Sequence, residues 1–194
     1  MLGTSSDEIL ERTTREKTVA TFQVDPSHTV VEFAVKHMMF STVKGRFADV
    51  KGQIEFDLEN PHLSSVVAEA STASVDTRDS QRDTHLRSPD FFDAETYPTI
   101  SFKSRRIEPG RDQTQARVIG DLTIRGVTRE VAFDVTHLGE GIDPWGGTRV
   151  GFNAVTTVNR KDFGLHWNAP LEAGGVLVGD NVKIELDIEA VKQS

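Results

Sequence analysis

The stretch ARVIGDLTIRGVTREVAFDVTH, residues 116–137, alternates apolar and polar side chains on both sides of the pair Arg125-Gly126. Successive side chains of a β-strand point to opposite faces of a sheet, so this period of two predicts two strands joined by a tight turn. The apolar faces would carry Ala116, Val118, Gly120, Leu122, Ile124, Val131, Phe133, Val135 and His137. The region therefore predicts an antiparallel hairpin with one apolar face.

The same alternation extends outward from this hairpin over most of the chain, with clusters of Gly, Pro, Asn and Asp between the runs. The very polar stretch 78–88 breaks the pattern and predicts a short helical excursion. Residues 1–18 are polar and mixed in charge, so we expect an N-terminal extension (1–18) followed by one β domain (19–194). The runs predict strands at about 19–24, 29–37, 43–57, 64–75, 98–107, 114–124, 128–138, 148–158 and 181–191.

Eight or so long antiparallel strands, each with one apolar face, either close into a barrel or stack as a sandwich. Strand length favours the barrel, because long strands in an open sheet expose edges that closure removes. The predicted fold is therefore all-β, an eight-stranded antiparallel β-barrel. Within 43–57 the phase changes between Phe47 and Val50, and a β-bulge near Ala48-Asp49 would repair the register.

Composition excludes several classes of function. The chain has 194 residues, and its 30 acidic against 22 basic residues give a formal charge of −8, which argues against nucleic acid as a partner. The absence of cysteine excludes disulfides, thiolate metal sites and a cysteine nucleophile. No apolar run approaches the roughly 18 to 20 residues of a membrane span, and residues 1–18 lack the pattern of a signal peptide. A cytoplasmic protein that does not span a membrane is expected.

The inward rows mix large apolar residues with small ones such as Ala68, Ala70 and Ala154. An eight-stranded barrel has room either for its own side chains or for one small ligand. The mixture predicts an elongated apolar tunnel in a barrel about 25 Å tall, with a filled core as the alternative. The residues expected to line the lumen are Phe33, Val35, Phe47, Phe102, Val118, Leu122, Phe133, Val135, Phe152, Ile184 and Leu186.

A few other positions leave alternatives open. His37 falls in phase with an apolar row, where it could hydrogen-bond a ligand head group or sit half exposed at a strand end. Phe91 and Phe92 would close the barrel mouth or plug its bottom as ordinary core, and the plug is the favoured alternative. Arg160 is expected to pair locally with Asp162, with an anionic head group as the alternative.

Signals for catalysis or metal binding are weak. The six histidines occur singly, without metal-ligand spacing, and no GxSxG, P-loop or GxGxxG motif is present, so neither a metal nor a cofactor is expected. Asp79, Arg82, Asp83 and His85 could form an acid–base set, although such a polar stretch is more typical of a solvated lid.

Several short motifs occur in an order that resembles the YceI-like family of polyisoprenoid-binding, lipocalin-like proteins. They span about Phe22 to Val191. The matching stretches are VDPSHT (24–29), VKHM (35–38), VKGRF (43–47), SVDT (74–77), RDTHL (82–86), DFFD (90–93), YPTISF (97–102), GDLTIRGVT (120–128) and RKDFG (160–164).

This resemblance implies a lipocalin-like barrel whose lumen holds a long-chain amphiphile: an isoprenoid, a quinone or a fatty-acid-like lipid. It also implies a homodimer. The leading hypothesis is a carrier or storage protein without enzymatic activity. Two alternatives remain: an enzyme acting on a lipid head group through His37 or the Asp83 and His85 region, and a filled barrel serving as an interaction module.

Overall fold

A computed structural model describes residues 19–172 and 174–193, so the predicted extension at 1–18 lies outside the described residues. The strands are β1 (Ala20–Val24), β2 (Val30–His37), β3 (Ser41–Phe47), β4 (Val50–Phe56), β5 (Ser65–Ser71), β6 (Val75–Asp76), β7 (Thr99–Pro109), β8 (Gln115–Ile124), β9 (Val127–Ile142), β10 (Thr148–Asn159) and β11 (Val178–Lys192). The helical elements are η1 (Pro61–Leu63), η2 (Thr72–Ser74), α2 (Ser80–Arg87) and η3 (Arg160–Phe163). The helix at Ser80–Arg87 confirms the predicted excursion within 78–88.

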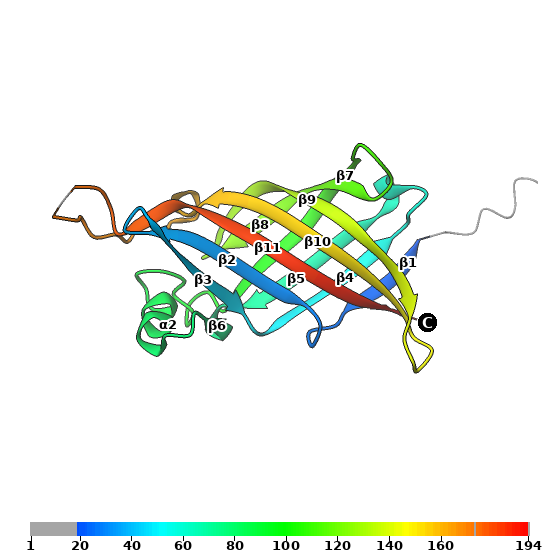
Figure 1. Cartoon of the computed structure of the whole chain (residues 1–194), viewed down its shortest axis with the longest axis horizontal. Coiled ribbons are helices and arrows are strands. Elements are labelled where there is room, and N and C mark those ends of the chain that lie inside the picture. The colour runs from blue at the N-terminus through cyan, green and yellow to red at the C-terminus, as the bar shows by residue number, and fades with distance from the viewer. Residues whose placement is uncertain (1–18, 173, 194) are drawn as a thin grey trace, which may run out of the picture.

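The strands form a closed antiparallel barrel (Figure 1). β1 and β2 lie end to end and together form one strand of the barrel, as do β3 with β4 and β5 with β6. With the remaining five strands, the barrel has eight strands. β11 closes the ring, because it pairs with β2 over one part of its length and with β1 over the other. The predicted eight-stranded antiparallel barrel is therefore confirmed.

The predicted single strand 43–57 is wrong, because the chain is interrupted at Ala48-Asp49 instead of carrying a bulge. The neighbouring barrel strand, made of β5 and β6, is interrupted at the same level by η2. Hydrogen bonds from Ala48 N to Ser74 O (3.2 Å) and from Ser71 N to Asp49 O (2.9 Å) join the two breaks. Two adjacent strands of the barrel therefore bend at this level, which leaves both Phe47 and Val50 buried on the inner side.

Figure 1 shows α2 and the loop that precedes β11 at one end of the barrel, and the C-terminus with the β9–β10 hairpin at the other. Two buried clusters, around Phe163 and around Val75, lie toward the α2 end. A third cluster fills the opposite half, around Phe22 and Ala190. None of the helices in the described part of the chain has the length and apolar character that a membrane crossing requires.

Candidate functional site

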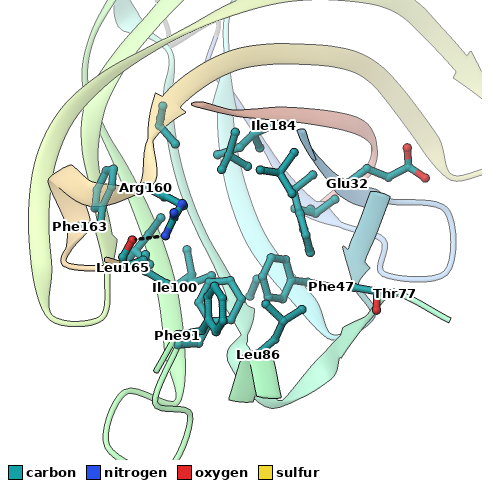
Figure 2. A pocket seen from close by; sticks show the side chains of 18 of the residues that line it. Glu32, Phe47, Thr77, Leu86, Phe91, Ile100, Arg160, Phe163, Leu165 and Ile184 are labelled. Carbon is teal, nitrogen blue, oxygen red and sulfur yellow. Dashed lines mark hydrogen bonds between the residues drawn. The ribbon is translucent and has the colours of Figure 1, made fainter. Parts of the chain in front are cut away.

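The barrel encloses a cavity of about 520 Å³ in the half that lies toward α2 (Figure 2). Its wall is mostly apolar, and Figure 2 shows Phe47, Leu86, Phe91, Ile100 and Ile184 around the open space. Sites for small molecules commonly measure roughly 300–1,000 Å³ and are lined by apolar side chains with a few polar groups. Eleven of the fourteen predicted site residues line it: Phe33, Val35, His37, Phe47, Phe91, Phe92, Phe102, Leu122, Phe133, Ile184 and Leu186.

The space exists because small residues face large ones on only part of the wall. Ala68 and Ala70 on β5 line the cavity, as their alternation predicts. On the neighbouring strands β2 and β3, the ring of Phe33 lies directly against the backbone of Gly45, where any Cβ atom would collide with it. The ring is therefore held close to the wall and leaves the centre of the barrel open.

The boundary between hollow and filled halves falls between successive inward residues of the same strands. On β11, Leu186 lines the cavity whereas Ile188 packs against the filled cluster. Likewise, Phe133 on β9 and Ala68 on β5 line the cavity, whereas Val135 and Val66, the next inward residues of these strands, pack against the filled cluster. A tunnel along the full barrel height was predicted, and that prediction is wrong for the half away from α2.

The three remaining predicted residues lie outside the cavity wall. Phe152 belongs to the filled cluster and Val135 packs against it. Val118 is buried and pairs with Phe133 across the β8–β9 ladder. The ring of His137 also lies here, 5.1 Å from the ring of Phe56. Ligand contact by Val118, Val135 and Phe152 stays a prediction.

The α2 end of the cavity carries its polar rim. Lys36, Asp79 and Gln81 line the cavity and are exposed, so the opening lies at this end. Phe91 and Phe92 lie at the same end, where the ring of Phe92 packs edge-on against Phe47 with centroids 5.5 Å apart. Phe91 is buried in the cluster around Phe163, and Phe92 packs against both clusters at this end, so the pair is core as well as cavity wall. Closure of the mouth by these two rings stays a prediction.

The charged residues of α2 hold the helix against the barrel. The carboxylate of Asp83 is buried and accepts hydrogen bonds from the backbone N–H (2.8 Å) and hydroxyl (2.6 Å) of Thr77. Asp79 caps the helix by accepting from Gln81 N and Arg82 N, and Arg82 Nε donates to the Thr77 hydroxyl. The prediction that this polar stretch is a solvated lid is therefore only partly right, because the Asp83 side chain is buried.

Arg160 does not form the predicted local pair with Asp162. Its side chain is buried, which lowers the pKa of the guanidinium, and its nearest carboxylate is that of Asp180 at 3.5 Å. Nη1 donates to the carbonyl oxygens of Leu165 (2.6 Å) and Trp167 (2.9 Å). The separation of two residues between Arg160 and Asp162 suggested the wrong partner. The Arg160 side chain, at the start of η3, instead points into the end of the barrel.

A second charged cluster lies at the filled end. Asp25, His28 and Glu189 bring ligand atoms within 4.8 Å of one another, an arrangement that a cation could use. Arg149 already pairs with both carboxylates, since its Nη1 donates to Asp25 (2.7 Å) and to Glu189. Hydrogen bonds from Ser27, Arg149 and His28 hold the pKa of Asp25 well below its ordinary value. These ion pairs link the β1–β2 turn to β10 and β11.

Comparison with known proteins places this barrel among close relatives. The YceI-like domain matches residues 22–190. A UPF0312 protein of Pseudomonas putida is 37% identical over 176 residues, covering 90% of this chain and 88% of the relative, and one of Pseudomonas aeruginosa is 36% identical over the same length.

Solved structures agree with these matches. BcnA of Burkholderia cenocepacia superposes with a TM-score of 0.76 at 26% identity, over 86% of this chain and 98% of BcnA. A polyisoprenoid binding domain from Saccharophagus degradans shares the fold, with a TM-score of 0.64 at 14% identity over 90% of this chain and 99% of that domain. With the motifs, the barrel and the match over residues 22–190 in agreement, the chain belongs to the YceI-like domain family.

Proposed function

We propose that this protein binds a long-chain isoprenoid, such as a polyprenyl compound or an isoprenoid quinone, in the barrel cavity and acts as its carrier or store. The observation that carries the proposal is the apolar cavity of about 520 Å³ that opens at a polar rim. An amphiphile matches both parts, since its chain can occupy the cavity while its head group stays at the rim.

The hydrophobic effect supplies enough free energy for such binding. Burial of one methylene group contributes about 0.8 kcal/mol, so ten such groups contribute roughly 8 kcal/mol before ordering costs, which corresponds to a micromolar dissociation constant. The structural neighbour from Saccharophagus degradans is named a polyisoprenoid binding domain, and this name supports the choice of ligand class.

The rim offers hydrogen-bond donors for a head group. His37 lines the cavity at the end of β2, next to Lys36, and Arg82 lines it from α2. A quinone carbonyl or a phosphate oxygen could accept from these groups. In this proposal the head group lies near His37 and the chain extends toward Leu122 and Phe133.

Lipid extraction and a cavity-blocking variant test the proposal. Purified protein analysed by native mass spectrometry should carry a stoichiometric lipid, or take up an added polyprenol or quinone. Ile184→Trp places an indole in the cavity and should weaken uptake by at least about tenfold. The matched control is Ile142→Trp on the exposed β9–β10 hairpin, which should bind as the wild type does. A protein that binds neither compound, or an Ile184→Trp variant with unchanged uptake, would contradict the proposal.

A further inference from the structure

Large apolar side chains are exposed at the tip of the β2–β3 hairpin. Met38, Met39 and Phe40 are 39%, 67% and 75% exposed, and Val176 on the adjacent loop is 42% exposed. These four residues are called the apolar tip. Figure 1 shows the hairpin and the loop that leads into β11 at the same end of the barrel as α2.

The apolar tip is held in one shape by the fold. Met38 N donates to Leu177 O (2.8 Å), and the sulfur of Met39 lies against Gly175, where a Cβ atom would collide with it. Met38 and Met39 have φ angles of 51° and 67°, a left-handed conformation that large side chains rarely adopt. Turns of this geometry favour Asn or Gly, so neither backbone preference nor solubility explains methionine at both positions.

The apolar tip adjoins the cavity mouth. His37 precedes Met38 directly and lines the cavity. Leu177 and Val178 follow Val176 and line it as well. A molecule that leaves the cavity past these residues therefore passes next to the apolar tip.

Two lysines lie directly behind the apolar tip, and Glu32 and Glu185 follow them farther along the same outer face. Lys36 pairs with Thr42 and Lys44 pairs with Ala34, so the two exposed lysines are diagonal neighbours on the outer face of β2 and β3. The chain as a whole carries a formal charge of −8. Apolar side chains flanked by lysine are typical of surfaces that enter the interface of an anionic bilayer.

We propose that the apolar tip inserts into the interface of an anionic lipid bilayer and that the cavity exchanges its ligand with that bilayer. This inference rests on the proposed function, because a long apolar chain crosses water only at a large cost in free energy. Contact between the mouth and the membrane removes that crossing.

Vesicle sedimentation tests the docking. Vesicles of phosphatidylcholine alone are compared with vesicles of two parts phosphatidylcholine to one part phosphatidylglycerol. The wild type should sediment with the mixed vesicles, and Met39→Ser with Phe40→Ser should reduce its partition at least about tenfold. Lys36→Glu with Lys44→Glu should reduce partition to the mixed vesicles only, and added salt should act in the same direction.

The control is Ile142→Ser with Trp145→Ser, two exposed apolar residues at the other end of the barrel, which should partition as the wild type does. Thermal unfolding of each variant checks that the fold is retained. A wild type that sediments with neither kind of vesicle overturns the proposal. So does a tip variant that changes the oligomeric state without changing partition, because the apolar tip would then contact a second copy of the chain.

Transfer experiments separate this inference from the proposed function. Polyprenol supplied in detergent should load the wild type and the Met39→Ser, Phe40→Ser variant equally, because the cavity is intact in both. Polyprenol supplied in mixed vesicles should load the variant at least about tenfold more slowly. If neither protein loads from detergent, the proposed function fails. If both load from vesicles at the same rate, only the membrane inference fails.

Discussion

The guanidinium group of Arg160 donates a hydrogen bond from Nη1 to the carbonyl oxygen of Leu165 at 2.6 Å, inside the end of the barrel (Figure 2). The same group reaches Trp167 O and Gly179 O, each at 2.9 Å. One buried side chain thus ties η3 to the loop that follows it and to the start of β11. Carbonyl oxygens of the chain accept these hydrogen bonds, and Asp180 is the carboxylate partner of the guanidinium group.

Arg160→Met should lower the free energy of unfolding by about 3 kcal/mol, because several buried carbonyl groups lose their donor. The matched control is Lys161→Met, which removes a neighbouring exposed ion pair with Asp180 and should change it by less than about 1 kcal/mol. Urea denaturation followed by circular dichroism measures both values. Equal losses in the two variants would show that the buried hydrogen bonds do not stabilise this end of the barrel.

The hollow and filled halves should respond differently to truncation of an aromatic side chain. Phe22 is 2% exposed within the filled cluster, so Phe22→Ala should lower the free energy of unfolding by about 3–5 kcal/mol. Phe33 borders a cavity that opens at the α2 end, so the space left by Phe33→Ala joins a volume that water can enter, and the variant should lower the free energy of unfolding by less than about 2 kcal/mol. The same urea titration compares the two, and a larger loss for Phe33→Ala would contradict the assignment of the halves.

Asp83→Ala should loosen α2, because the backbone N–H of Thr77 then has no acceptor in a buried position. We expect a loss of about 2 kcal/mol in stability and faster amide exchange in Ser80–Arg87, measured by hydrogen–deuterium exchange. Asp79→Ala removes the helix cap and an exposed ion pair with Arg82, and should cost about 1 kcal/mol. Unchanged exchange in Asp83→Ala would mean that other contacts position the helix.

Asp25 should make stability depend on pH. Hydrogen bonds from Ser27, Arg149 and His28 lower its pKa in the folded protein from the ordinary value of 3.8. A depressed folded-state pKa stabilises the fold at pH values above the unfolded pKa, and this contribution is lost as the pH falls toward the folded pKa. Asp25→Asn should therefore lower the free energy of unfolding by about 1–3 kcal/mol at neutral pH, and the gap should narrow below about pH 4.

Urea titrations of both proteins across this pH range provide the measurement. Asp134→Asn, a change at an exposed carboxylate, serves as the control. A gap between wild type and Asp25→Asn that stays constant down to low pH would exclude titration of this carboxylate as its cause.

Strand periodicity predicted which side chains face inward but not how deep they lie. Phe133 and Val135 share one face of β9, yet the first lines the cavity and the second packs against the filled cluster. Both have the same phase and the same apolar character. Depth along the barrel axis depends on strand tilt and stagger, which a single strand does not encode.

Partners of charged residues were the least predictable feature. Asp162 is two residues from Arg160, whereas the observed carboxylate partner, Asp180, is twenty residues away on β11. The apolar tip was also missed, although the exposed run Met38-Met39-Phe40 at a predicted turn was a visible signal. Large apolar residues in a turn are unusual enough to mark a surface worth testing.

Alternation of apolar and polar residues by itself indicated most of the strands and their inward faces, because each strand exposes one face at every second residue, and strand length favoured closure of the sheet. Only the tertiary structure decided that one half of the barrel is packed and the other hollow. That outcome depends on the summed volume of side chains from strands distant in sequence, such as Ala68 on β5 and Phe33 held against Gly45 on β2 and β3. Volume is a property of the assembled ring and of no single strand.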